Sequence, residues 1–281
     1  MKSRAFRLLA LSFFLLPLWA LNAFADSVVN LGTAVTFGVL AGSTVTNTGS
    51  SVISGNVGVW PGLAVTGFPP GIVNAPGIKH LGDAVAQTAQ SDLTTAYNVA
   101  AGLTPTGTLT GKNLGGLTLT PGVYFFADSA QLTGKLTLDT LGISNPQFVF
   151  QIGSTLTTAS SSSVVFSNSL TDSNVFWQVG SSATLGTTTS FQGNILALTS
   201  ITLNTGASIG CGSALAQNGA VTLDSNTIGG GCSSTSGGGG GGGGGTSTVP
   251  EPGTLGLLGT GLVILAGAAR RKMRILHSVR P

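Results

Sequence analysis

The chain has 281 residues, of which 42% are hydrophobic and only 7% are charged. Val, Leu, Ile and Phe recur through the middle of the chain, which argues against intrinsic disorder. Residues 26–249 contain three Lys and seven Asp, so their net charge is three minus seven, or −4. An acidic body repels phosphate backbones, which excludes a nucleic-acid-binding protein.

Residues 1–25 have the features of a secretory signal peptide. Basic residues precede the apolar stretch Leu8–Leu21, and Ala23-Phe24-Ala25 matches a cleavage site of small residues. We expect signal peptidase to cleave after Ala25, which leaves a mature chain that begins at Asp26. An uncleaved membrane anchor is the alternative.

The body of the chain is repetitive. The dipeptide Thr-Leu begins at Thr118, Thr137, Thr155, Thr184, Thr202 and Thr222. The intervals are 19, 18, 29, 18 and 20 residues, and such a regular period is typical of a solenoid. Alternation would place each Leu inside and each Thr outside, with Gly, Ser and Asn at the corners. The sequence therefore predicts a mainly β fold over residues 26–232, an irregular β-solenoid (β-helix) of roughly triangular section. A β-sandwich is the alternative.

One long helix is expected at about residues 78–101. Apolar residues recur there every three or four positions, and Pro76-Gly77 and Gly102 mark its ends. Its expected length of about 33 Å is close to that of six stacked coils. We therefore expect the helix to pack alongside the solenoid and to cover one side. Residues 26–76 are expected to form a further coil or a cap.

Cys211 and Cys232 are the two cysteines of the chain. Their separation is slightly more than one repeat, so neighbouring coils could bring them together, and export permits a disulfide. Two free thiols are the alternative. No further Cys or His lies nearby, so neither a metal site nor a cysteine nucleophile is expected.

The C-terminal part contains several segments. A Gly/Ser-rich linker covers residues 233–248, and Pro250-Glu251-Pro252 follows it. Residues 254–269 are apolar and uncharged, short for a transmembrane segment, and a basic cluster ends at Arg274 before the tail 275–281. Residues 249–274 thus resemble a PEP-CTERM sorting signal. The resemblance implies processing by an exosortase-type protease and delivery to the cell surface or extracellular matrix, with transient or lasting inner-membrane anchoring through this segment alone. A plain membrane anchor is the alternative.

The body offers little material for catalysis. It has one His, His80, and its Asp residues are scattered, so we expect no enzyme, no cofactor and no metal site. Hydroxyl residues instead recur three and six positions after the Thr of several Thr-Leu pairs. These candidate site residues are Thr158, Ser161, Thr187, Ser190, Thr205 and Ser208. Stacked coils would align them on a flat, uncharged face. Surface Thr and Ser that only favour strands and turns are the alternative.

Residues 35–232 resemble the large microbial ice-binding family. The resemblance rests on several motifs in one order, among them Asn56–Gly62, Asp92–Tyr97, Thr120–Tyr124 and Asn218–Asp224. The family implies an irregular β-solenoid with one long helix, and adsorption to ice through one flat face. Some members carry a Thr-(Ala/Gly)-x-(Thr/Ser/Asn) pattern there, which Thr205-Gly206-Ala207-Ser208 fits.

The resemblance implies a secreted or surface-held antifreeze protein that inhibits ice recrystallisation and whose partner is ice or ordered water. The alternative is a structural or adhesive protein of the extracellular matrix or biofilm, with extracellular polysaccharide as a partner. A carbohydrate-active enzyme on a β-helix lacks the necessary carboxylates. We expect Trp60 and Trp177 to be core or cap residues rather than sugar platforms.

Overall fold

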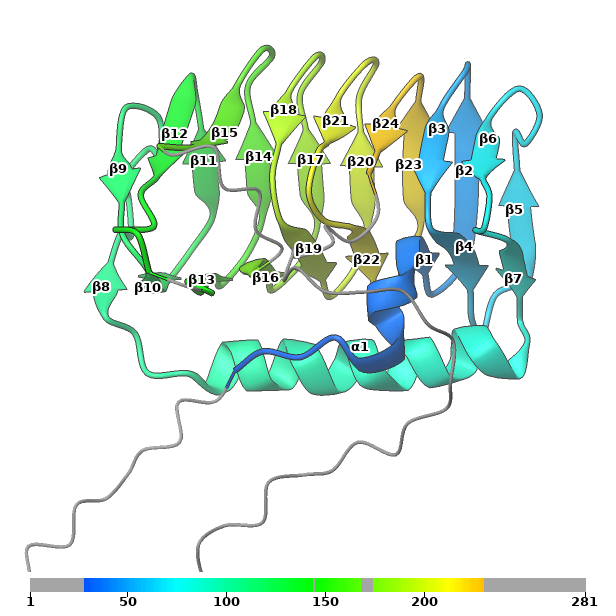
Figure 1. The fold of residues 1–281 in the computed structure, drawn as a ribbon, viewed down its shortest axis with the longest axis horizontal. Coiled ribbons are helices and arrows are strands. Elements are labelled where there is room, and N and C mark those ends of the chain that lie inside the picture. Colours follow the sequence, from blue (N-terminus) through cyan, green and yellow to red (C-terminus); the bar gives the residue numbers. More distant parts are fainter. Residues whose placement is uncertain (1–27, 144, 168–173, 230–281) are drawn as a thin grey trace, which may run out of the picture. The chain divides into compact units, whose positions relative to one another are not determined.

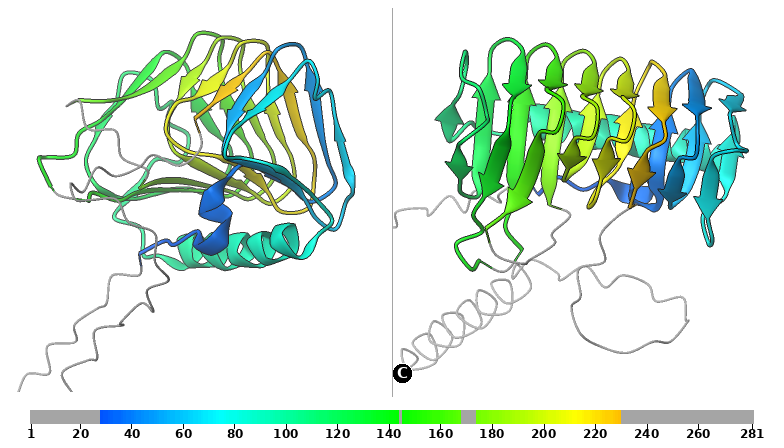
Figure 2. Two further views of the ribbon diagram at one scale, coloured as in Figure 1. Left: turned by 45° about the vertical axis from the view of Figure 1, so that its right-hand side comes forward. Right: turned by 90° about the horizontal axis from the view of Figure 1, so that it is seen from above.

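The structure is a computed structural model, and it describes residues 28–143, 145–167 and 174–229. In this part of the chain, 24 short strands form three parallel sheets, one on each side of a solenoid. The section of the solenoid is roughly triangular, and a single α-helix runs along one side (Figures 1 and 2). The predicted fold class is therefore confirmed.

Each sheet is a row of parallel strands, in which every strand is hydrogen-bonded to its neighbours. From one edge to the other, sheet A contains β7 (Lys79–Leu81), β4 (Asn56–Val59), β1 (Phe37–Ala41), β22 (Ala214–Ala216), β19 (Asn194–Ala197), β16 (Val175–Val179), β13 (Phe148–Ile152), β10 (Gly122–Phe126) and β8 (Gly107–Thr108). Sheet B contains β11 (Ala130–Leu132), β14 (Leu156–Thr158), β17 (Ala183–Leu185), β20 (Ile201–Leu203), β23 (Val221–Asp224), β2 (Thr44–Thr48) and β5 (Ala64–Thr66). Sheet C contains β6 (Ile72–Asn74), β3 (Val52–Ser54), β24 (Thr227–Ile228), β21 (Ser208–Ile209), β18 (Ser190–Phe191), β15 (Ser163–Phe166), β12 (Lys135–Leu138) and β9 (Thr118–Leu119).

The coils are not stacked in sequence order. The chain first builds β1 to β7 near one end, and the helix then carries it to the other end, where β8 begins (Figure 1). The following coils return toward the start, until β22, β23 and β24 pair with β1, β2 and β3. The segment before the helix therefore forms further coils, as its repeat character predicts.

Aromatic side chains fill part of the solenoid interior. The rings of Phe150 and Trp177 stack with centroids 3.8 Å apart and planes 7° apart, and Phe191 contacts Trp177 at 4.9 Å. The indole Nε1 of Trp177 donates a hydrogen bond of 3.0 Å to the carbonyl oxygen of Gln192. Trp177 is fully buried, which confirms it as a core residue. This packing makes the solenoid a rigid support for its outer faces.

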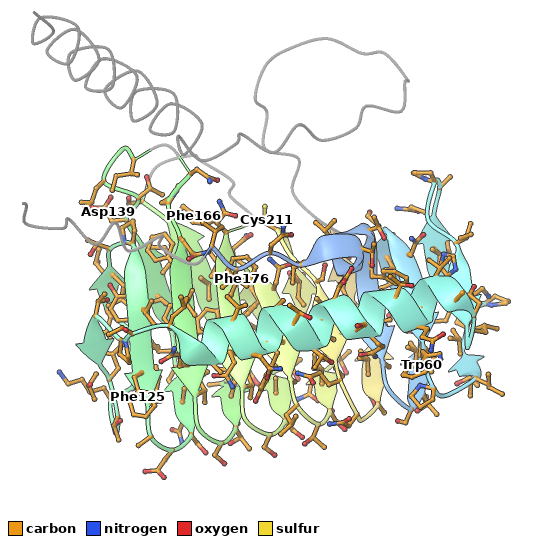
Figure 3. The ribbon with its side chains drawn as sticks, turned by 90° about the horizontal axis from the view of Figure 1, so that it is seen from below. Trp60, Phe125, Asp139, Phe166, Phe176 and Cys211 are labelled. Carbon is orange, nitrogen blue, oxygen red and sulfur yellow. The ribbon has the colours of Figure 1, made fainter. Side chains whose placement is uncertain are left out.

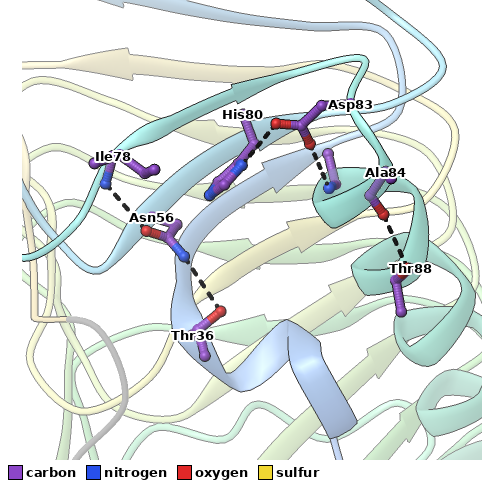
Figure 4. Close-up of polar contacts among 8 residues, drawn as sticks. Thr36, Asn56, Ile78, His80, Asp83, Ala84 and Thr88 are labelled. Carbon is purple, nitrogen blue, oxygen red and sulfur yellow. Dashed lines mark hydrogen bonds and ion pairs between the residues drawn. The ribbon is translucent and has the colours of Figure 1, made fainter.

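The helix α1 (Ala84–Gly102) begins six residues later than predicted. Residues 79–81 alternate as β7 and extend sheet A beside β4 instead. Asp83 then caps the helix, because its carboxylate accepts a hydrogen bond of 2.9 Å from the backbone N–H of Ala86 (Figure 4). This bond and the contact with His80 at 2.8 Å lower the pKa of Asp83 below its usual range. The start of the apolar period therefore belongs to a strand, and the capping residue fixes the start of the helix.

The helix covers sheet A, as expected. Its buried residue Leu93 packs in one cluster with Phe176, Leu196 and Leu215, whose side chains point outward from the strands of sheet A. A short 3-10 helix η1 (Gly32–Thr36) lies beside it (Figure 3). At the C-terminal end of α1, the side chain of Gln151 donates hydrogen bonds of 2.8 Å to the carbonyl oxygens of Ala100 and Leu103. Because sheet A is covered, sheets B and C provide the open faces of the solenoid.

Candidate functional site

Sheet B carries a row of threonines on its outer side. Neighbouring strands pair in register, so one outward-facing residue of each strand lies beside that of the next. The row consists of Gln131, Thr157, Thr184, Thr202, Thr222, Thr46 and Thr66. We call its six threonines the threonine row. Each is exposed or half-buried, whereas the residues before and after it point into the core in most strands.

The geometry of the threonine row is regular. Parallel strands lie about 4.8 Å apart, and no register shift interrupts the pairs along sheet B. Threonine is β-branched, so its side chain has few rotamers to choose from. Hydroxyl and methyl groups therefore repeat at fixed intervals along the solenoid axis.

A second row of small residues lies toward the edge that sheet B shares with sheet A. Ser129 and Thr155 contact each other there through their hydroxyls at 2.8 Å. The hydroxyl of Ser182 accepts a hydrogen bond of 3.3 Å from the backbone N–H of Ser200, one coil further on. Among the described strands of sheet B, Asp224 is the one charged residue, and its carboxylate accepts a hydrogen bond from the hydroxyl of Thr205. The face is thus nearly free of charge.

Sheet C presents a more varied outer side. Its register aligns Val52, Thr227, Ser208, Ser190, Ser163 and Lys135, and Ile72 lies at one end. This row therefore contains four neighbouring hydroxyl residues, Thr227, Ser208, Ser190 and Ser163, with apolar residues on one side of them and Lys135 on the other. Sheet B is the more uniform of the two open faces.

The structure does not bring the six candidate residues to one face, and Thr158 lies on none. It is 3% exposed, and its hydroxyl contacts that of Thr189 at 2.8 Å inside the corner between sheets B and C. The backbone N–H of Gly186 also donates to it at 2.8 Å. Alternation in β14 turns Thr157 outward and Thr158 inward, so the expectation of a surface position for Thr158 is wrong.

The other five candidates divide between a corner and a neighbouring face. Ser161, Thr187 and Thr205 are exposed in the turns between sheets B and C, whereas Ser190 and Ser208 are register partners on sheet C. Counting three and six residues from Thr-Leu therefore follows the chain around a corner. A residue count along the chain does not identify a face unless the corner positions are known.

The Thr-Leu dipeptides themselves occupy more than one sheet. Thr118 and Thr137 pair with each other in sheet C. In β14 the member of the threonine row is Thr157, two residues after the Thr155 of the dipeptide. None of the six candidate site residues therefore belongs to the threonine row, and only half of the row is expected from the sequence to point outward, as the Thr of Thr-Leu pairs. The three missed residues are Thr157, Thr46 and Thr66. The Thr-x-Thr alternation in residues 44–46 and 155–157 is the signal that could have located two of them.

Cys211 is 1% exposed and disulfide-bonded. Its expected partner, Cys232, lies outside the described residues, so the pairing stays a prediction. The following predicted segments also lie outside them: the signal peptide 1–25, the linker 233–248, the motif Pro250-Glu251-Pro252, the apolar segment 254–269 and the tail 275–281. Among the residues that the structure describes, no helix is long and apolar enough to cross a membrane, and no group of three His, Cys, Asp or Glu could hold a metal ion.

Comparisons with known proteins agree with this architecture. The model of the family described as ice-binding-like matches residues 39–229, and that of the PEP-CTERM protein-sorting motif matches residues 248–272. An ice-binding protein of Nostoc sp. (strain HG1) is 58% identical over 254 residues, which cover 90% of this chain and 91% of the relative. An ice-binding protein of Colwellia sp. is 36% identical over 242 residues, which cover 76% of this chain and 91% of the relative.

Solved structures of ice-binding proteins have the same fold. One from an Antarctic biological consortium aligns with a TM-score of 0.69 at 50% identity and covers 72% of this chain and 90% of its own. Another, from the Antarctic ascomycete Antarctomyces psychrotrophicus, aligns with a TM-score of 0.69 at 42% identity and covers 74% of this chain and 100% of its own. The chain therefore belongs to the ice-binding-like family, and it carries a PEP-CTERM protein-sorting motif.

Proposed function

We propose that this protein binds ice through the outer side of sheet B. The observation that carries the proposal is the threonine row, which continues in register across β14, β17, β20, β23, β2 and β5. The names of the relatives in Nostoc and Colwellia support it. Sheet A is covered by α1, and the hydroxyl row of sheet C is shorter, contains one Thr and three Ser, and ends beside Lys135.

The chemistry of the row suits a surface of ordered water. Each hydroxyl both donates and accepts hydrogen bonds, so it can take the place of a water molecule in a lattice. Each methyl group lies beside its hydroxyl and favours water that hydrogen-bonds only to other water molecules. Because the side chains are already ordered on a rigid support, binding costs little side-chain entropy. Many weak contacts then act together on one crystal surface.

Ice binding is tested by the freezing behaviour of the purified full chain. We expect a gap between the melting and freezing temperatures, faceted crystals in nanolitre osmometry, and slower recrystallisation. The variant Thr222→Tyr should remove most of the gap, since a bulky ring would hold the face away from the ice. Round crystals and normal recrystallisation with the folded wild-type chain would contradict the proposal.

The PEP-CTERM motif supports export to the cell surface or the extracellular space. In the scheme that we propose, signal peptidase cleaves after Ala25 and an exosortase-type protease processes the chain near Pro250-Glu251-Pro252. Cell fractionation, followed by mass spectrometry of the N- and C-terminal peptides, tests both steps. Full-length, uncleaved chain in the cytoplasm would contradict them.

A structural or adhesive role in the extracellular matrix is the second candidate. The sorting motif and the Gly/Ser-rich linker 233–248 favour it, because together they would hold a folded domain away from a surface. Deletion of the gene should then alter cell aggregation or biofilm formation at temperatures where no ice forms. An unchanged biofilm in the deletion strain would argue against this role.

A further inference from the structure

A pocket of about 540 Å³ lies beside α1, at the edge between sheets A and B. Its lining includes Trp60, Gln87, Ser91, Thr94, Gln217 and Asn218. These side chains come from three distant parts of the sequence: the turn after β4, the middle of α1 and the turn after β22. The volume is within the range of about 300–1,000 Å³ that is typical of ligand pockets.

The backbone fixes the turns that carry the pocket. The N–H of Trp60 donates a hydrogen bond of 3.0 Å to the carbonyl oxygen of Ala41. In the same corner, Gly62 donates to Gly42 and Gly42 donates to Gly219, each at 3.0 Å. A side chain at Gly62 would place its Cβ atom 1.8 Å from the carbonyl oxygen of Ser43, so glycine is required there. The turns before β5, β2 and β23 are thus bonded to one another.

A hydrogen bond also attaches α1 to these turns. Gln90 on α1 donates a hydrogen bond of 3.1 Å to the carbonyl oxygen of Ala216, at the end of β22. This contact is buried and holds the polar side of the helix against the turn that carries Gln217 and Asn218. The pocket is therefore assembled in the folded chain before any ligand arrives, which lowers the entropy cost of binding.

The pocket offers hydrogen-bonding groups that are not used internally. Among the described residues, none bonds to the indole Nε1 of Trp60, the side-chain amide of Gln87 or the hydroxyl of Ser91. The amide nitrogen Nε2 of Gln217 is buried and also has no partner there. Gln87 and Ser91 are exposed, so their amide and hydroxyl groups are accessible to hydrogen bonds from a ligand.

We propose that this pocket binds neutral pyranose units of an extracellular polysaccharide. The indole ring of Trp60 offers a flat apolar surface for the C–H face of a sugar ring. Amide and hydroxyl side chains supply donors and acceptors together, as the adjacent hydroxyls of a pyranose require. The lining contains no charged side chain, so it has nothing to compensate the burial of an acidic sugar or a phosphate.

Trp60 differs from Trp177 in its exposure to solvent. Trp177 is fully buried in the aromatic stack, whereas Trp60 is half-buried and lies at the flank of α1 (Figure 3). The sequence-based expectation that both are core or cap residues therefore holds for Trp177, and the surroundings of Trp60 fit a sugar platform. None of the lining residues belongs to the threonine row, so sugar binding and ice binding do not depend on each other.

Tryptophan fluorescence tests the proposal with three neutral probes: cellohexaose, laminarihexaose and maltohexaose. The assay uses the chain from Asp26 onward, which lacks Trp19 of the signal peptide. Because Trp177 is fully buried, a sugar-dependent change in emission then reports on Trp60. We expect a saturable change with at least one probe. Isothermal titration calorimetry, which needs no tryptophan, measures the variants: Trp60→Ala and Gln217→Ala should each weaken the affinity about tenfold or more. Gln131→Ala, in sheet B, is the matched control and should bind as the wild type does.

Several outcomes would overturn the proposal. One is the absence of any response to the three sugars by the folded chain from Asp26 onward. Another is unchanged binding by Gln217→Ala and by Trp60→Phe, two variants that preserve the fold if Trp60→Ala does not. A response to hexaproline or oligogalacturonate in place of the neutral sugars would assign the pocket to a peptide or an acidic glycan. The Trp60 and Gln217 variants should bind ice as strongly as the wild type does.

Discussion

Thr46 in β2 and Thr222 in β23 lie side by side as register partners, although one belongs to the first coil and the other to the last. Their pairing joins the part of the chain that precedes α1 to the part that follows it. The threonine row crosses this junction without a register shift, because Thr46 also pairs with Thr66 on its other side. The length of the proposed ice-binding face therefore depends on a contact between distant parts of the sequence.

Because the row crosses this junction, the effect of a substitution on thermal hysteresis should depend on its position in the row. Thr46→Tyr should lower thermal hysteresis more than Thr66→Tyr does, since it interrupts the row whereas Thr66 only ends it. Conversely, Gln131→Thr extends the row by one strand beyond Thr157 and should raise hysteresis modestly. Nanolitre osmometry at equal protein concentrations measures all three. Equal losses for the two Tyr variants would contradict the importance of an uninterrupted row.

A pair of hydrogen bonds fastens α1 to the segment before β1. The backbone N–H and the hydroxyl of Thr33 both donate to the carboxylate Oδ2 of Asp92, each at 2.7 Å. These two bonds, the backbone one first, lower the pKa of Asp92 below its usual 3.8. A lowered folded-state pKa stabilises the protein above the unfolded-state pKa, and this stability is lost as the pH falls through the folded-state value.

We therefore expect Asp92→Asn to destabilise the protein at neutral pH by about 1 kcal/mol, a value reduced for solvent exposure. The difference from wild type should shrink as the pH falls below about 4 and through the lowered folded-state pKa of Asp92. Thermal unfolding at a series of pH values measures it. Asp128→Asn serves as the control, because the Asp128 carboxylate accepts no hydrogen bond from a described residue. A pH-independent difference would show that the carboxylate charge is not involved.

The contact between α1 and sheet A predicts a large cost for cavity formation. Leu93 is fully buried between the helix and the outward side of sheet A, so Leu93→Ala should destabilise the fold by about 3 kcal/mol. Val85 on the same helix is 48% exposed, and Val85→Ala should change stability by less than about 0.5 kcal/mol. Denaturant unfolding measures both. Similar losses for the two variants would indicate that the helix is not held by this cluster.

The cysteine prediction is tested by chemistry. We expect peptide mapping under non-reducing conditions to recover one cross-linked pair that joins Cys211 to Cys232. Reduction should lower stability by about 3 kcal/mol, as a loop of this length predicts. The recovery of Cys232 as a free thiol would refute the pairing.

The sequence predicts the fold more completely than the site, and particular residues show why. Thr202-Leu203 and Thr222-Leu223 repeat a local alternation, which specifies strands and a solenoid period without reference to distant contacts. The start of α1 could not be placed from periodicity, because β7 continues the apolar pattern in a strand. There the hydrogen bond from Ala86 to Asp83 determines the boundary.

The functional face depends on register and on corner geometry, which the sequence does not display. Corners differ from coil to coil, so residues six positions after the Thr of Thr-Leu lie in a corner, as Ser161 does, or on sheet C, as Ser208 does. The contribution of Thr46 depends on the pairing of the first coil with the last. The pocket at Trp60 likewise requires three distant segments to meet. Neither arrangement can be recognised from a short stretch of the sequence.

The most direct test of the proposed face compares two tyrosine substitutions within one coil. Thr202→Tyr alters β20 on sheet B, and Ser208→Tyr alters β21 on sheet C. The measured quantity is the fraction of folded protein that partitions into slowly growing ice. We predict that Thr202→Tyr loses most of this partitioning, whereas Ser208→Tyr keeps it at the wild-type level. Loss in Ser208→Tyr together with wild-type partitioning of Thr202→Tyr would contradict the assignment of ice binding to sheet B.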